Sequence, residues 1–165
     1  MTKKFILLKH QIEEELAELT GVVNKIERMY DIVKQGKAED LSVYTDSLAL
    51  NLHGFYSGIE KILETIVEKT GEGRPAGGKW HRELLQQVTF PVEGIRPPVL
   101  SSDTRKSLEG YLDFRHRVRN IYAYNIDFDK MELLIKQVRT TFDIFNSDMS
   151  NFLVFLTEMQ DSLEL

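Results

Sequence analysis

The sequence predicts an all-α fold, an up-and-down bundle of four long helices with a short extra helix in the 71–102 connection. Apolar residues recur in alternating steps of three and four along most of the chain, which is the spacing of one face of an α-helix. Glycines near residues 36 and 71–78 separate the periodic segments. Long helices with one apolar face each must bury those faces together, so we expect residues 1–165 to form a single helical domain.

The first two predicted helices form a hairpin. The first ends near Gly36, because glycine is common just beyond helix ends. Its apolar face comprises Phe5, Leu8, Ile12, Leu16, Leu19, Val23, Ile26, Tyr30 and Val33. The second ends before the glycines at 71 and 73, and its apolar face comprises Leu41, Tyr44, Leu48, Leu52, Phe55, Ile59, Ile62 and Ile66. The short connection at Gly36 makes the two helices antiparallel neighbours.

The second half of the chain begins with a long connection. A loop-rich segment of roughly thirty residues contains all four prolines of the chain and a short helix from Trp80 to Val88, and segments this long tend to be functional. We expect Trp80 and His81 to pack on the bundle, since a tryptophan can anchor a short amphipathic helix. A long helix follows from residue 103 to about 125, with Asp103 as its N-cap. The last runs from Met131 to Met159.

The composition excludes several kinds of site. The chain has no cysteine, so it forms no disulfide, thiolate metal site or cysteine nucleophile. Its four histidines lack the spacing of a metal-binding pair, and we expect neither a metal ion nor a cofactor. The net charge of -5 argues against general nucleic-acid binding but leaves room for a local basic site that binds RNA. Without a long apolar run or a signal-peptide pattern, we expect a cytoplasmic protein with no membrane partner.

The most distinctive segment runs from Phe114 to Tyr124 and contains three arginines without an acid. At about 100° per residue, one arc beside the apolar face carries a set of polar residues, and Arg117 and Tyr124 point elsewhere. The residues of this arc are Arg115, His116, Arg119 and Asn120. Arginine can bind a phosphodiester bidentately, and histidine can transfer a proton near neutral pH. In the alternative interpretation, the arginines only pair with acids such as Asp113, Glu109 or Asp127.

Four segments together resemble the HEPN superfamily, specifically its HepT-like members. They are Leu52–Glu60, Trp80–Leu85, Arg96–Pro97 and Phe114–Tyr122. The resemblance implies a helical bundle that dimerises through the helix carrying an Arg-x(4 to 6)-His motif, so that two copies build a composite site for metal-independent RNA cleavage. It also implies a toxin–antitoxin context, in which a small nucleotidyltransferase neutralises a ribonuclease toxin.

Carried onto this chain, the resemblance makes Arg119 the motif arginine. Because no histidine follows His116 in the sequence, only His116 can supply the catalytic imidazole. Four residues beyond Arg119, where the motif histidine is expected, the chain has a tyrosine. The remaining predicted site residues bind substrate: Arg115, Asn120, Tyr122 and Tyr124. Two hypotheses follow: a dimeric ribonuclease silenced by a nucleotidyltransferase, or a noncatalytic substrate-binding or adaptor subunit of such an enzyme. In either, the last two tyrosines are candidate targets of nucleotidyl transfer.

Overall fold

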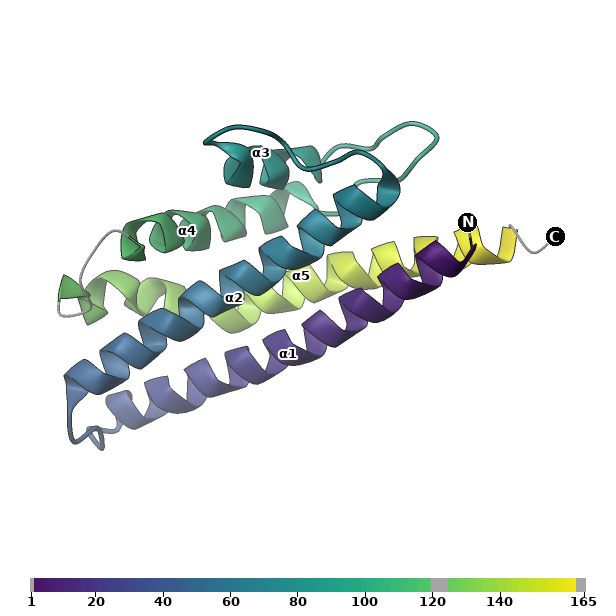
Figure 1. The fold of residues 1–165 in the computed structure, drawn as a ribbon. Coiled ribbons are helices and arrows are strands. Elements are labelled where there is room, and N and C mark those ends of the chain that lie inside the picture. Colours follow the sequence, from purple (N-terminus) through teal and green to yellow (C-terminus); the bar gives the residue numbers. More distant parts are fainter. Residues whose placement is uncertain (1, 120–124, 163–165) are drawn as a thin grey trace.

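The computed structural model describes residues 2–119 and 125–162, and this part of the chain is a bundle of α-helices (Figure 1). The helices are α1 (Thr2–Lys34), α2 (Leu41–Thr70), α3 (Trp80–Gln87), α4 (Ser102–Val118) and α5 (Phe128–Ser162). The predicted all-α bundle, with its short extra helix in the 71–102 connection, is confirmed. None of these helices is long and apolar enough to cross a membrane.

Helices α1 and α2 are antiparallel neighbours, as their short connection predicts (Figure 1). Gly36 makes the turn with a positive φ of 66°, a conformation that glycine adopts without steric cost. Asp40 then caps α2 by accepting a hydrogen bond from the backbone N–H of Ser42. The helices approach closely at Gly58, where an added Cβ would lie 2.8 Å from a methyl carbon of Leu19.

Helix α2 is central to the core, because it contacts each of the other four helices. Its Phe55 ring lies edge-on to Tyr111 of α4 and to Phe142 of α5, with centroid distances of 5.2 Å and 6.2 Å. All three rings are buried, and the Tyr111 hydroxyl donates a hydrogen bond to the carbonyl of Leu134 at 2.7 Å. These contacts fix α4, which carries the predicted site, against α2 and α5.

A buried ion pair fixes the connection between α2 and α4. The guanidinium of Arg96 donates two hydrogen bonds to the carboxylate of Glu72, at 2.6 Å and 2.7 Å, and a third to the carbonyl of Phe90 at 2.9 Å. Burial raises the pKa of Glu72, but hydrogen bonds from Arg96, Thr70 and Gln87 outweigh it, so this pKa lies below its ordinary value. The pair thereby holds the 71–102 connection, and α3 within it, at a defined position.

The start of α4 corrects one expectation. Ser101, and not Asp103, is the N-cap: its hydroxyl accepts a hydrogen bond from the backbone N–H of Thr104. Asp103 lies in the first turn instead, where its charge favours the positive end of the helix dipole. Helix α4 is described as far as Val118, so the predicted extension to about residue 125 falls mostly on 120–124, outside the described residues.

Candidate functional site

The candidate site lies where α2, α3 and α4 meet. Helix α4 contributes Arg115 and His116 from its last turn, α3 contributes His81 from its first turn, and α2 contributes Glu60. Glu60 and His81 are buried, whereas His116 is exposed. Two residues of the predicted basic arc therefore meet two buried polar residues that were not among the site residues predicted from the sequence.

A short hydrogen bond joins Glu60 and His81. The Nδ1 atom of His81 lies 2.6 Å from Oε2 of Glu60, and the two side chains are only 10% and 7% exposed. A carboxylate on Nδ1 favours the ring form in which this nitrogen carries the proton and donates it. Since water is largely excluded, the contact is electrostatically stronger than it would be at the surface.

Arg115 contacts both members of this pair. Its Nη2 atom lies 3.6 Å from Oε1 of Glu60, and its Nη1 atom lies 3.5 Å from each ring nitrogen of His81. The Arg115 side chain is 13% exposed. Its Nε and the hydroxyl of Ser57 are the two buried side-chain polar atoms for which the described part of the chain shows no hydrogen-bond partner. The polar groups of Glu60, His81 and Arg115 thus form a compact, incompletely satisfied cluster.

The contacts of Arg115 bear on the interpretation that the arginines pair with nearby acids. Arg115 does pair with an acid, but the acid comes from α2. Asp113 is held by Arg82 at 2.6 Å, and Glu109 pairs with Arg105. Arg115 is therefore directed toward the buried carboxylate of α2 and does not pair with an acid of its own helix.

Flat side chains surround His81. Trp80 stacks on the His81 ring at a centroid distance of 3.7 Å, and the guanidinium of Arg74 lies over Trp80 at 4.2 Å. The ring of His116 stands edge-on to His81, 5.4 Å between centroids at an interplanar angle of 76°. Trp80 also packs against the hydrophobic core, as expected from the sequence. His81 is buried but belongs to the polar cluster, so packing alone does not describe it.

The pKa of His116 lies below its ordinary value of 6.5. Burial is the largest cause, followed by the positive charges of His81 and Arg115, while Asp113 and Glu60 oppose the shift. The imidazole is consequently neutral at pH 7 and able to accept a proton. A neutral, accessible imidazole beside an arginine is a reasonable candidate for a general base.

His53, one turn of α2 before Ser57, belongs to the same electrostatic environment. Its pKa is lowered first by burial and then by the positive charges of Arg115 and Arg119. Arg119 is the C-cap of α4, where its backbone N–H donates to the carbonyl of Arg115, and its side chain is exposed. The two predicted arginines thus act on one position of α2. The other predicted binding residues, Asn120, Tyr122 and Tyr124, lie outside the described residues.

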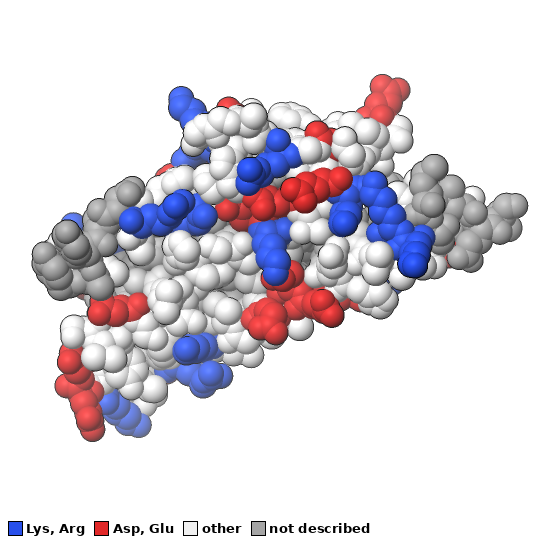
Figure 2. Space-filling model, viewed as in Figure 1, with Lys and Arg blue, Asp and Glu red and all other residues white. Residues whose placement is uncertain are grey.

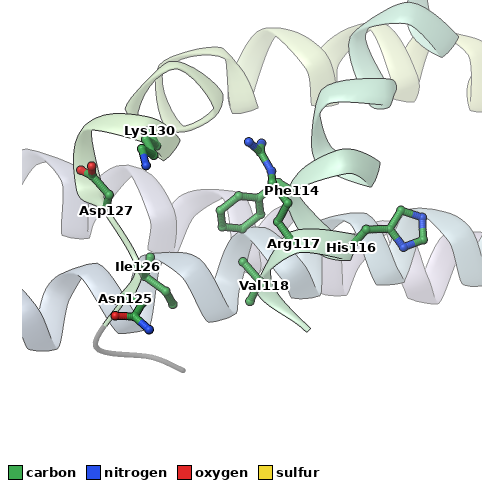
Figure 3. Close-up of a pocket in the computed structure, with 8 residues that line it drawn as sticks. All are labelled: Phe114, His116, Arg117, Val118, Asn125, Ile126, Asp127 and Lys130. Atoms are coloured by element: carbon green, nitrogen blue, oxygen red, sulfur yellow. The ribbon is translucent and has the colours of Figure 1, made fainter. Parts of the chain in front are cut away.

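A cavity of about 540 Å³ lies on the other side of the end of α4 (Figure 3). Its lining residues are Phe114, His116, Arg117, Val118, Asn125, Ile126, Asp127 and Lys130. Figure 3 shows the His116 ring directed away from Ile126 and Lys130, while Phe114 and Val118 form an apolar part of the cavity wall. Arg117 and Asp127 therefore belong to this cavity, and His116 stands between it and the polar cluster.

The charges on the face viewed in Figure 2 do not gather into one basic patch. Blue and red side chains alternate across it. A surface of this kind offers little of the continuous positive charge that binds a long stretch of phosphates. Any anion bound on this face is therefore held by a few local groups.

Comparison with known proteins decides the family. A family model described as HepT-like protein matches residues 47–156. The chain belongs to the HepT-like family. This match confirms the membership of the HEPN superfamily predicted from the sequence. No curated protein and no solved structure matches the chain. Every residue of the polar cluster, together with His116 and Arg119, lies within the matched part of this HepT-like protein.

Within 2–119 and 125–162, no group of three or more histidine, aspartate or glutamate side chains is placed to hold a metal ion. Glu60 is instead hydrogen-bonded to His81 and lies 3.6 Å from the guanidinium of Arg115.

Proposed function

We propose that this HepT-like protein is a metal-independent ribonuclease of the toxin type, in which His116 is the general base and Arg119 binds the scissile phosphate. The observation that carries the proposal is the placement of His116 within a HepT-like chain. Its imidazole is exposed, has a lowered pKa and lies beside Arg115, one turn before Arg119. We also propose that the protein acts in the cytoplasm and requires no cofactor.

The proposed chemistry is transesterification within the RNA. Neutral His116 takes the proton of a ribose 2′-hydroxyl, and the 2′-oxygen attacks the adjacent phosphorus. The guanidinium of Arg119 stabilises the charge that develops on the phosphate oxygens. The bond to the 5′-oxygen then breaks, and this oxygen takes up a proton from water or from the protonated imidazole of His116 of the partner subunit. The products are a 2′,3′-cyclic phosphate and a 5′-hydroxyl.

A homodimer fits this scheme, because one imidazole cannot serve as base and acid at the same moment. His116 and Arg119 lie at the exposed end of α4, where a second copy can approach them. Two copies related by a twofold axis would bring two imidazoles and two motif arginines to one phosphate. Light scattering of the purified protein tests this step, and a strict monomer at working concentration would contradict it.

The decisive experiment measures RNA cleavage in the presence of EDTA. We expect His116→Ala to lower the rate by about 10²–10⁴-fold, as the loss of a general base does. Arg119→Ala should lower it by about 10²–10³-fold, as the loss of a group that stabilises transition-state charge does. Arg117→Ala is the matched control, since it removes the same charge from the same helix but on the cavity side. Full cleavage by the first two variants, or none by the wild type, would refute the proposal.

A second candidate function is that of a noncatalytic substrate-binding or adaptor subunit of a nucleotidyltransferase. Tyr124 favours it, because a tyrosine with an ordinary pKa near 10 is a poor base where the family motif has histidine.

In either function, we propose a small nucleotidyltransferase as the partner, with Tyr122 and Tyr124 as acceptors of nucleotidyl groups. Coexpression with such an enzyme, followed by intact-mass measurement of the wild type and of a Tyr122→Phe, Tyr124→Phe variant, tests the modification. A toxicity that the partner suppresses would favour the nuclease.

A further inference from the structure

We infer that Glu60 and His81 are positioning residues for Arg115 and His116. The inference rests on the proposed function, since it names the groups that prepare its base and one of its arginines. Glu60 lies at the centre of the arrangement, because one of its oxygens meets His81 and the other meets Arg115. His81 then presents its ring to His116. The four side chains come from three helices.

Glu60 is rigidly placed. It is 5% exposed on the buried side of α2, where Ile59 and Leu63 beside it are part of the core. With the 2.6 Å contact to Nδ1, it fixes which His81 nitrogen carries the proton and how the ring is turned. A carboxylate that orients a histidine from a rigid helix is a common way to support a functional group.

A stack of planar groups also holds His81. Trp80 lies on the His81 ring, Arg74 lies on Trp80, and a 3.4 Å contact with Glu64 holds Arg74. The ring therefore has little freedom to turn away from His116. This stack makes the edge-on contact between the two imidazoles a fixed feature of the site.

The chemistry of the cluster favours a functional role over a purely structural one. Burying a carboxylate, a guanidinium and an imidazole costs free energy that apolar side chains of similar volume would not cost. Apolar residues at these three positions would join α2, α3 and α4 equally well. The cluster also leaves the buried Nε of Arg115 without a partner in the described residues, so its hydrogen bonding is not optimised for stability.

His81 acts on His116 through charge as well as through contact. The charged and titratable groups near His116 are His81 on α3, Glu60 on α2, Asp113 and Arg115 on α4. Arg117, Asp127 and Lys130 line the cavity on its other side. After burial, the electrostatic effect of His81 lowers the His116 pKa most. Removing His81 should therefore raise this pKa towards its ordinary value.

The first test is an NMR titration of the His116 imidazole, assigned with a His116→Gln variant. We expect His81→Gln to raise the His116 pKa measurably, whereas His10→Gln, on exposed α1 surface, should leave it unchanged. Loosening of α3 could also raise this pKa by admitting water. Leu84→Ala controls for that, because it removes a buried contact of α3 without removing a charge. An unchanged His116 pKa in His81→Gln, or an equal rise in Leu84→Ala, would overturn the inference.

The second test is a double-mutant cycle for RNA cleavage with Glu60→Gln, His81→Gln and the double variant. If Glu60 acts through His81, each single variant loses activity and the double loses clearly less than the product of the two losses. Losses that multiply would show independent effects and would overturn the inference. Helix content and the fluorescence of Trp80, the sole tryptophan, verify folding. If the wild type does not cleave RNA, the proposed function fails, and the titration alone still decides the inference.

Discussion

The Glu72–Arg96 pair and the Glu60–His81–Arg115 cluster are both buried, but their hydrogen bonding differs. Arg96 meets Glu72 through two short parallel hydrogen bonds, and Thr70 and Gln87 donate further bonds to the same carboxylate. Arg115, by contrast, lies 3.6 Å from its carboxylate. The first pair has the geometry of the strongest protein ion pairs, and the second does not.

The difference separates a structural role from a functional one. The first pair contains no imidazole and fixes the connection between α2 and α4, so its role is structural. The cluster contains a histidine that reaches a second, exposed histidine. Partly satisfied groups that can titrate are typical of functional sites, where stability is given up for reactivity. The comparison therefore predicts large effects on stability for the pair and large effects on activity for the cluster.

The largest expected loss of stability comes from breaking the Glu72–Arg96 pair. Arg96→Ala leaves Glu72 buried without its cation, and we expect the free energy of unfolding to fall by about 3–5 kcal/mol. Urea unfolding followed by circular dichroism measures this change. The double variant Glu72→Leu, Arg96→Met should recover most of the loss, because it removes both charges. A loss below roughly 1 kcal/mol in Arg96→Ala would mean that the pair is not structural.

The cluster should respond in the opposite way when all its charges are removed together. We expect the triple variant Glu60→Leu, His81→Leu, Arg115→Met to be as stable as the wild type or more stable by about 1–4 kcal/mol, since a buried ionic cluster is replaced by apolar packing. The same variant should not cleave RNA. Thermal unfolding and the cleavage assay provide the two readouts. Destabilisation as large as that of Arg96→Ala would remove the distinction between the two regions.

The long helices could be predicted because each has one apolar face with regular spacing. The same helical spacing predicted that His116 and Arg119 lie beside the apolar face of their own helix. The N-cap of α4 could not be chosen from spacing, because Ser101 and Asp103 are both acceptable capping residues two positions apart. The structure selects Ser101, whose own backbone N–H donates to Asp148 of α5. That contact depends on the position of α5, which local sequence does not define.

The Glu60–His81 contact was missed for a similar reason. It depends on where α3 lies, and the Glu72–Arg96 pair in the long connection sets that position. A signal was nevertheless present at Glu60. The buried positions Leu52, Tyr56, Glu60, Leu63 and Val67 follow helical spacing, so a carboxylate stands where an apolar side chain is expected. A charge on a core-facing position requires a partner, which could have directed attention to His81 and Arg115.

A smaller effect distinguishes a satisfied polar atom from an unsatisfied one. Gln87→Ala removes a hydrogen bond to Glu72 and should lower the free energy of unfolding by about 0.5–1.5 kcal/mol. Ser57→Ala removes a buried hydroxyl without a partner in the described residues, so we expect no loss and a gain of up to roughly 1 kcal/mol. Parallel urea titrations compare the two. A clear loss in Ser57→Ala would reveal an interaction of that hydroxyl in solution.

The smallest expected effect is a pH dependence of stability in two stages. His53 and His116 have lowered pKa values in the folded protein, so the unfolded chain binds more protons just below pH 6.5, and stability falls as the pH drops through that range. The pKa of Glu72 is lowered from 4.5, so this residue adds a second loss of stability only below pH 4.5. Urea midpoints measured from pH 8 to pH 3 should show both stages. The Glu72→Leu, Arg96→Met variant should retain the histidine stage and lose the Glu72 contribution. An unchanged acidic stage would assign it to other carboxylates and weaken the contrast between the two regions.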